Sequence, residues 1–193
     1  MTQTQRLFIA CPLPAALTEA CVALQDQCMA LVKRPRPLQP GDLHLTLRFL
    51  GPTPAALLPD LGAALQALAG QSGPFDLQSA ALGGFPQPQA AHVLVWHMQL
   101  SHALQALYDR LQHSLQSLGT APEARPYKPH VTLLRCPRQA LPALPAAPLH
   151  FWRADRLSFY RSELSPAGSR YTRLSDAMLG ETEAPAAQGG PHD

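Results

Sequence analysis

Two stretches of the sequence combine a histidine with a threonine two residues later. "HLTLRFLG" carries His44 and Thr46, and "HVTLLRCP" carries His130 and Thr132. Both stretches are otherwise mainly apolar, which is typical of β-strands. Because side chains at positions i and i+2 of a strand share a face, each stretch is predicted to present an imidazole beside a hydroxyl.

Two histidines of this kind suit acid–base chemistry at a phosphate. The ordinary pKa of histidine is about 6.5, so at neutral pH one imidazole can act as a base while the other, protonated, acts as an acid. The hydroxyls and a nearby arginine can bind the non-bridging oxygens of a phosphate. No paired carboxylates accompany the two stretches, which argues against a two-metal phosphatase. A single histidine on a strand is more often structural, so the hypothesis depends on the pair.

Two arginines are candidate phosphate ligands. Strict alternation along the first strand places Arg48 on the face of His44 and puts Phe49 on the core-facing side. Arg135 has the opposite parity to His130. It joins the same face only if the strand bulges or ends before the Cys-Pro pair that follows, and proline makes such an ending plausible.

The two stretches must be positioned by a scaffold of mixed helices and strands. Helices are predicted where leucine or cysteine recurs every three or four residues, at 14–32, 55–69 and 101–118. Strands are predicted at 6–13, 43–50, 75–85, 92–100, 130–135, 156–164 and 169–179.

Each half of the chain contains a strand, a helix and one His-x-Thr strand. Two similar lobes that face each other would bring these strands together across a cleft, so we expect one bilobal domain over residues 1–180. Residues 181–193 are too polar and too rich in glycine and proline to bury a core, and they are predicted to be a disordered tail.

Composition excludes several other classes of protein. The net charge of +2 is too small for a typical duplex-binding protein. The four cysteines form no C-x-x-C pair, and His92, His97 and His102 do not share a face, so no metal site, no cofactor and no disulfide framework are expected. No apolar run is long enough to cross a membrane. We expect a cytoplasmic monomer that binds no membrane.

The chain also resembles a known family. The blocks "QRLFIACPLP", "DLHLTLRFLG", "RPYKPHVTLLR" and "FYRSELSPAGSRYTRL" follow one another in the order found in the bacterial and archaeal RNA 2',3'-cyclic phosphodiesterases. This group is also named the 2'-5' RNA ligase family and belongs to the two-histidine phosphoesterases. The resemblance implies an α/β (α+β) bilobal fold in which two antiparallel sheets line a central cleft and the helices lie outside.

The resemblance also implies roles for the candidate residues. His44 would be the proton donor to the departing ribose 3' oxygen, and His130 would be the proton acceptor that activates water. Thr46 and Thr132 would hold phosphate oxygens, with Arg135 as a further contact. The substrate would be RNA that ends in a 2',3'-cyclic phosphate, such as a tRNA fragment, and the product would be a 2'-phosphate. A reversible 2'-5' ligation would be the reverse step.

Two other functions stay open from the sequence. The chain could be a non-catalytic module that binds RNA ends, although both histidines are intact. It could also be a phosphodiesterase that acts on another cyclic or 2'-5'-linked nucleotide, because the same acid–base pair would serve. Tyr127, Lys128, Arg161 and Arg170 are open candidates for contacts with RNA, as is Arg48.

Overall fold

The computed structural model describes residues 3–165 and 168–180. The α-helices are α1 (Ala15–Met29), α2 (Leu58–Gly70) and α3 (His102–Gln116), and short 3-10 helices span Pro40–Asp42, Ala55–Leu57 and Pro88–Ala90. The strands are β1 (Thr4–Pro12), β2 (Arg36–Pro37), β3 (His44–Pro54), β4 (Phe75–Phe85), β5 (Ala91–Met98), β6 (His130–Gln139), β7 (Phe151–Ala154), β8 (Arg156–Ser165) and β9 (Gly168–Met178).

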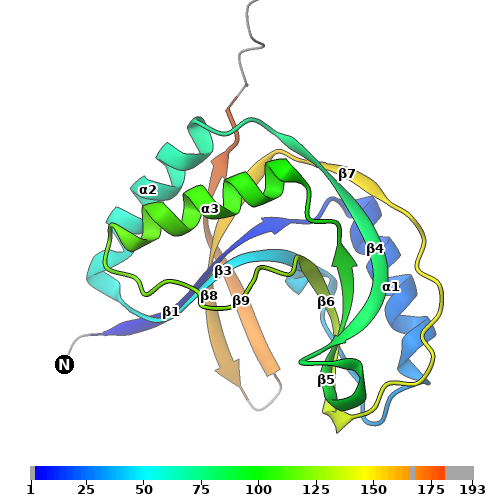
Figure 1. Cartoon of the computed structure of the whole chain (residues 1–193). Helices are drawn as coiled ribbons and strands as arrows, with labels where there is room; N and C mark the ends of the chain where they lie inside the picture. Colours follow the sequence, from blue (N-terminus) through cyan, green and yellow to red (C-terminus); the bar gives the residue numbers. More distant parts are fainter. Residues whose placement is uncertain (1–2, 166–167, 181–193) are drawn as a thin grey trace, which may run out of the picture.

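All strand pairs in the described residues are antiparallel, and they form one curved sheet (Figure 1). Its strand order is β7-β4-β5-β6-β3-β1-β8-β9, with β2 paired to β6. The predicted α/β fold with antiparallel strands is confirmed, and the two sheets expected around the cleft are the two halves of this one sheet. The two halves of the sheet are joined where Leu45 of β3 pairs with Val131 of β6. The two motif strands are therefore direct neighbours at the centre of the sheet.

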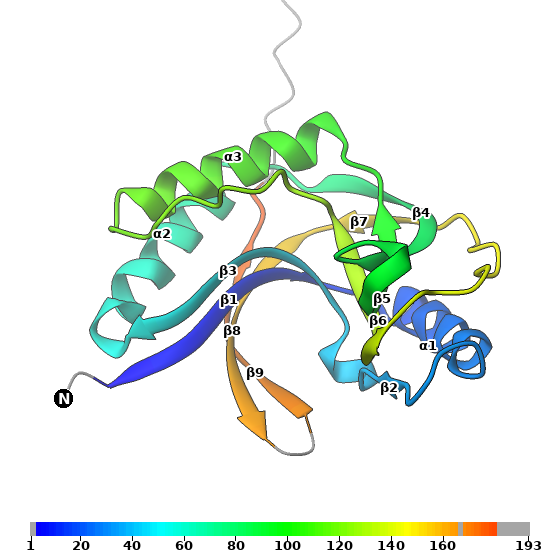
Figure 2. The ribbon, with the colours of Figure 1, turned by 60° about the horizontal axis from the view of Figure 1, so that its bottom comes forward.

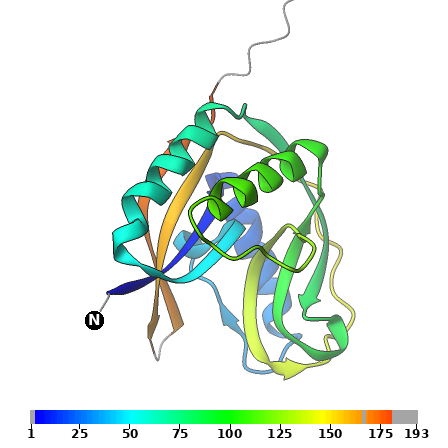
Figure 3. The ribbon, with the colours of Figure 1, turned by 60° about the vertical axis from the view of Figure 1, so that its left-hand side comes forward.

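The helices form because each buries one apolar stripe. In α1, Leu17, Cys21, Leu24 and Cys28 are buried at the predicted spacing, and this helix contacts β6. Helices α2 and α3 lie side by side over the other part of the sheet, as Figures 2 and 3 show, and α2 contacts β8 and β9. The N-terminus of α3 is capped because the hydroxyl of Ser101 accepts a hydrogen bond from a backbone N–H of the first turn.

Strand β1 shows which face of the sheet belongs to the core. Leu7, Ile9 and Cys11 lie in the main hydrophobic core beneath the helices. Phe8 and Ala10 point to the opposite face, where they pack with the ring of Tyr160 and form a separate small cluster. Residues of β3 can therefore be assigned to a face from their partners on β1.

Two strands were not predicted from the sequence. β2 has only two residues, and β7 has four residues that follow a stretch rich in alanine and proline. The predicted tail at residues 181–193 lies outside the described residues. Within residues 3–165 and 168–180, no helix has both the length and the hydropathy needed to cross a membrane.

Candidate active site

The two motif strands line a cavity of about 620 Å³. Five of the predicted site residues meet there, namely His44, Thr46, His130, Thr132 and Arg135. Its volume falls in the range of small-molecule binding sites, which is about 300–1,000 Å³.

The pairing of Leu45 with Val131 explains why the four polar side chains meet. Both apolar residues are completely buried in the main core. Their neighbours along each strand must therefore project from the opposite face. Because the strands run antiparallel, the register places His44 opposite Thr132 and Thr46 opposite His130. The arrangement has an approximate twofold axis through this pair.

Each motif strand contains a β-bulge directly after its threonine. In β3, Thr46 pairs with Ala10 and Arg48 pairs with Ile9, so Leu47 is the extra residue. In β6, Thr132 pairs with Val95 and the next pair is Leu134 with Leu94, which makes Leu133 the extra residue. One extra residue reverses the alternation of side chains beyond it.

The bulges decide which later residues reach the cavity. Arg135 is carried to the face of His130, which is the outcome that a bulge was expected to give. Phe49 also lines the cavity and is 42% exposed. The prediction that strict alternation would put Arg48 on the face of His44 is wrong. Arg48 is only 7% exposed and lies outside the cavity lining, because its partner Ile9 faces the core.

A side chain from outside the ladder forms a hydrogen bond at each bulge. Gln25 of α1, which is 4% exposed, donates from Nε2 to the carbonyl oxygens of Leu133 and Leu38, both at 2.9 Å. The backbone N–H of Leu38 donates to the same Leu133 oxygen at 3.1 Å. In β3, the hydroxyl of Tyr127 donates to the carbonyl oxygen of Thr46 at 3.0 Å. These bonds satisfy backbone groups that a regular ladder would have paired.

The two imidazoles are held in the same way. Nδ1 of His44 lies 2.7 Å from the carbonyl oxygen of Asp42, and Nδ1 of His130 lies 2.7 Å from that of Lys128. A carbonyl oxygen can only accept, so Nδ1 carries the proton in both rings. This tautomer leaves Nε2 of each ring free to exchange a proton with a ligand.

Burial makes both histidines less basic. It lowers the pKa of His44 to about 4, with further lowering by the positive charges of His130 and Arg135 and an opposing contribution from the Asp42 carbonyl. The pKa of His130 is also lowered by burial, against the opposing effect of the Lys128 carbonyl. In the free protein both imidazoles are therefore neutral at pH 7. The predicted state, with one imidazole protonated and the other neutral, requires a bound anion that stabilises the positive charge.

Aromatic rings support both histidines, and the sequence motifs gave no sign of them. The ring of Phe8 is stacked on His44 with centroids 4.7 Å apart, and Tyr171 meets the same imidazole edge-on at 5.3 Å. On the other side, the rings of Phe85 and His130 are 4.7 Å apart. A usable signal for Phe8 was the alternation of β1, which sets it apart from the core residues on either side.

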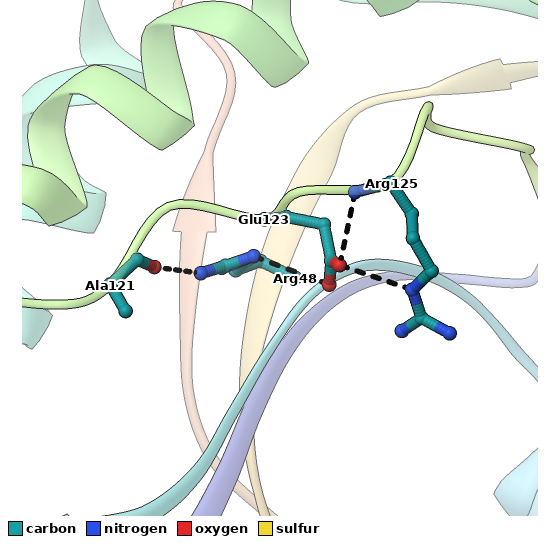
Figure 4. Close-up of polar contacts among 4 residues, drawn as sticks. All are labelled: Arg48, Ala121, Glu123 and Arg125. Atoms are coloured by element: carbon teal, nitrogen blue, oxygen red, sulfur yellow. Dashed lines mark hydrogen bonds and ion pairs between the residues drawn. The ribbon is translucent and has the colours of Figure 1, made fainter.

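The segment between α3 and β6 is fastened to β3 by Arg48 (Figure 4). The Arg48 guanidinium donates to the carbonyl oxygen of Ala121 and, at 3.5 Å, to the carboxylate of Glu123. Glu123 also accepts from Nε of Arg125 at 3.2 Å. Tyr127 stacks on Tyr108 with centroids 4.2 Å apart. These contacts hold the segment along one wall of the cavity.

Two of the remaining four candidates for contacts with RNA line the cavity. Lys128 and Tyr127 line the cavity, whereas Arg161 and Arg170 do not. Arg161 pairs with Glu163 at 3.3 Å. Across residues 3–165 and 168–180, no cluster of three or more histidine, cysteine, aspartate or glutamate side chains could hold a metal ion.

Comparison with known proteins identifies relatives along most of the chain. An RNA 2',3'-cyclic phosphodiesterase of Thermus thermophilus is 34% identical over 196 residues, which cover 95% of this chain and 96% of that protein. The crystal structure of TT0787, also of Thermus thermophilus, has a TM-score of 0.79 at 32% identity, over 92% of this chain and 100% of that one. The Escherichia coli LigT complex with 3'-AMP has a TM-score of 0.75 at 27% identity, over 93% and 100% of the two chains.

The family model of the 2'-5' RNA ligase superfamily matches residues 13–166, a span that contains both His-x-Thr strands and most of the sheet. The resemblance found in the sequence blocks is confirmed, and the chain belongs to the 2'-5' RNA ligase superfamily.

Proposed function

We propose that this protein hydrolyses 2',3'-cyclic phosphate ends of RNA to 2'-phosphates by metal-free acid–base catalysis between two histidines. The observation that carries the proposal is the placement of His44 and His130 on one cavity that Thr46 and Thr132 also line, each imidazole with Nδ1 bound to a carbonyl. Relatives named RNA 2',3'-cyclic phosphodiesterase support the hydrolase activity and its substrate class.

In this mechanism Nε2 of His130 takes a proton from a water molecule as the water attacks phosphorus. The bond between phosphorus and the ribose 3' oxygen breaks, and His44 donates a proton to that oxygen. The hydroxyls of Thr46 and Thr132 and the guanidinium of Arg135 bind the non-bridging oxygens, where negative charge accumulates in the transition state. The proton gained by one histidine and the proton lost by the other balance over the reaction.

The lowered pKa values bear directly on this mechanism. His44 has to be protonated to act as the acid, and in the free protein burial, followed by the positive charges of His130 and Arg135, opposes that charge. A bound phosphate anion attracts the proton and counteracts the repulsion from Arg135, so its arrival raises the pKa of His44. Substrate binding and protonation of the acid are therefore coupled.

The decisive experiment uses an RNA oligonucleotide that ends in a 2',3'-cyclic phosphate. We expect the protein to convert it to a product with a terminal 2'-phosphate, and the product isomer is identified by phosphorus NMR. Binding without turnover would favour a non-catalytic RNA-end-binding module. Turnover of other cyclic or 2'-5'-linked nucleotides in preference to the oligonucleotide would favour a phosphodiesterase that acts on those nucleotides. The Escherichia coli complex with 3'-AMP supports a nucleotide ligand.

The proposal extends to ligation and to the state of the protein. In ligation a 5' hydroxyl takes the place of water: it loses its proton to His130 as it bonds to phosphorus, the bond from phosphorus to the ribose 3' oxygen breaks, and His44 protonates that oxygen, which leaves a 2'-5' linkage. We propose that the protein works as a monomer, since every residue that is assigned a role lies on one chain. We also propose that tRNA fragments with cyclic phosphate ends are among its substrates.

The pH dependence is expected to differ between kcat/KM and kcat. The first reports the free enzyme, in which the pKa values of both histidines are lowered, so its bell should have its alkaline limb below about pH 6.5. The second reports the complex, in which the bound phosphate raises the pKa of the acid, so its alkaline limb should lie at higher pH. Rates measured between pH 4 and 9 check this expectation, and coincident or flat profiles would contradict the proposed pair.

Removal of divalent metal should leave the activity intact. The acid, the base and the phosphate ligands are all supplied by side chains, and the described part of the chain holds no cluster that could bind a metal. We expect the rate in excess EDTA to equal the untreated rate. A loss that zinc or magnesium restores would exclude the metal-free mechanism.

Gln25→Met is expected to raise KM by about tenfold without touching either histidine, since displacement of a positioned group by about 1 Å can cost up to about a hundredfold. The substitution removes the hydrogen bonds of Gln25 to the carbonyl oxygen of Leu133, in the bulge of β6, and to that of Leu38, and this bulge carries Arg135 to the cavity. The matched control is Gln66→Met, which removes a similar helix-to-strand bond to Asp176 outside the cavity lining. If Gln25→Met raised KM as much in an Arg135→Ala background, the effect would not pass through Arg135.

A further inference from the structure

The segment between α3 and β6 brings two positive charges to the cavity that the proposed reaction does not use. Arg125 and Lys128 both line the cavity. The acid, the base and the phosphate ligands of the reaction come from other residues.

Arg125 is oriented by a carboxylate. Glu123 accepts from its Nε at 3.2 Å and from its backbone N–H at 3.4 Å. Nε is only one of the five N–H donors of a guanidinium, and the other four belong to the two terminal nitrogens. Figure 4 shows these terminal nitrogens pointing away from Glu123. The side chain is 86% exposed, so its terminal nitrogens are accessible to a ligand.

The carboxylate of Glu123 is in turn held by Arg48. Arg48, with its side chain only 8% exposed, bonds to Glu123 and also donates to the Ala121 carbonyl. Arg48 and Arg125 both pair with the single carboxylate of Glu123, so the three groups together carry a net positive charge, and the terminal nitrogens of Arg125 remain available to a ligand. A side chain that is already oriented loses less conformational freedom when it binds an anion.

Lys128 lies at the end of the segment next to the reaction centre. Its carbonyl oxygen fixes His130, and its ammonium charge contributes, after burial and His130, to the lowered pKa of His97, which is the cross-strand partner of His130. Arg125 precedes it by three residues on the same wall. The two cations therefore extend from the histidine pair along the cavity wall.

We propose that Arg125 and Lys128 form a subsite for a second phosphate, the phosphodiester on the 5' side of the terminal nucleotide. The inference rests on the proposed function, because it assumes that the cyclic phosphate lies between the histidines. An RNA chain carries its next negative charge at that phosphodiester, whereas a free cyclic mononucleotide has none. The subsite thus makes the enzyme select chain ends over free cyclic nucleotides.

The test compares two substrates in each variant. A ribodinucleotide with a 2',3'-cyclic phosphate end should have a kcat/KM at least about tenfold above that of the matching mononucleoside 2',3'-cyclic phosphate, the effect of one charge-assisted contact. Arg125→Ala and Lys128→Ala should each reduce this ratio several-fold, chiefly through KM of the dinucleotide. The ratio should also fall as the salt concentration rises.

Arg153→Ala is the matched control, because Arg153 is also exposed and paired with a carboxylate, that of Asp76 at 3.3 Å, but lies outside the cavity lining. It should leave the ratio unchanged. A wild-type ratio near one, or a ratio that survives both substitutions, would overturn the subsite while the proposed function stands. If neither substrate turned over, the proposed function would fail. The subsite would then be judged by calorimetry with the 2'-phosphate forms of the two ligands, where equal affinities would overturn it.

Discussion

His44→Ala and His130→Ala are each expected to reduce kcat by about 10²- to 10⁴-fold, the range for a general acid or base. Each substitution removes a proton-transfer group from Nε2 and leaves the threonines and Arg135 in place, so KM should change much less than kcat. Initial rates over a range of cyclic phosphate concentrations separate the two parameters. The double variant should be little worse than either single variant, because the two groups act in one step.

The control for these substitutions is His113→Ala, at the C-terminal end of α3 and outside the active-site cavity. Its kcat should match that of the wild type. The two catalytic variants should differ in stability, since His44 is buried in the stack with Phe8 whereas His130 is less buried. Rates must therefore be compared well below the melting temperatures. Retention of wild-type kcat in either folded variant would assign that histidine a structural role only.

Phe8→Ala is expected to reduce the free energy of unfolding by about 3–5 kcal/mol, the usual cost of deleting a buried phenylalanine ring. Phe8 has no exposed surface and stacks on both His44 and Tyr160, with centroids 4.7 Å and 4.9 Å apart. For a chain of this size the loss corresponds to a melting temperature about 6–20 °C lower. The folded variant should also lose kcat, because His44 is then free to tilt from its stacked position.

Phe151→Ala is the control for this prediction. Phe151 lies on the edge strand β7 and is 66% exposed, so its removal should change the melting temperature little. Thermal unfolding followed by circular dichroism measures both variants. Equal melting temperatures for the two would show that the aromatic cluster contributes nothing to stability.

The sequence predicts the parts of the fold that depend on local patterns. Leucine and cysteine at helical spacing locate all three α-helices of the described chain, and apolar runs locate the motif strands. His44, Thr46, His130 and Thr132 could be assigned to shared faces because the regular alternation of each strand holds as far as the threonine, and each bulge comes directly after it.

Other features depend on contacts that are distant in the sequence. The bulge at Leu133 is held by Gln25, 108 positions earlier, and nothing within "HVTLLRCP" distinguishes a bulged strand from a regular one. Nothing within "HLTLRFLG" indicates the bulge at Leu47 either. This bulge exchanges the faces that strict alternation predicts for Arg48 and Phe49. Strand β7 depends on a partner in β4 and has too few residues for a pattern of its own.

The pairing of Leu45 with Val131 has a consequence for the direction of the chemistry. A half-turn about an axis through this pair exchanges the two imidazoles and the two hydroxyls, so the backbone alone offers a substrate two equivalent orientations. Microscopic reversibility makes the acid of one direction the base of the other. Phe49 and Arg135 occupy equivalent places after the two bulges but differ in chemistry. Together with the deeper burial of His44, this mismatch distinguishes the two orientations, and under the proposed function it sets the polarity in which a strand of RNA would bind.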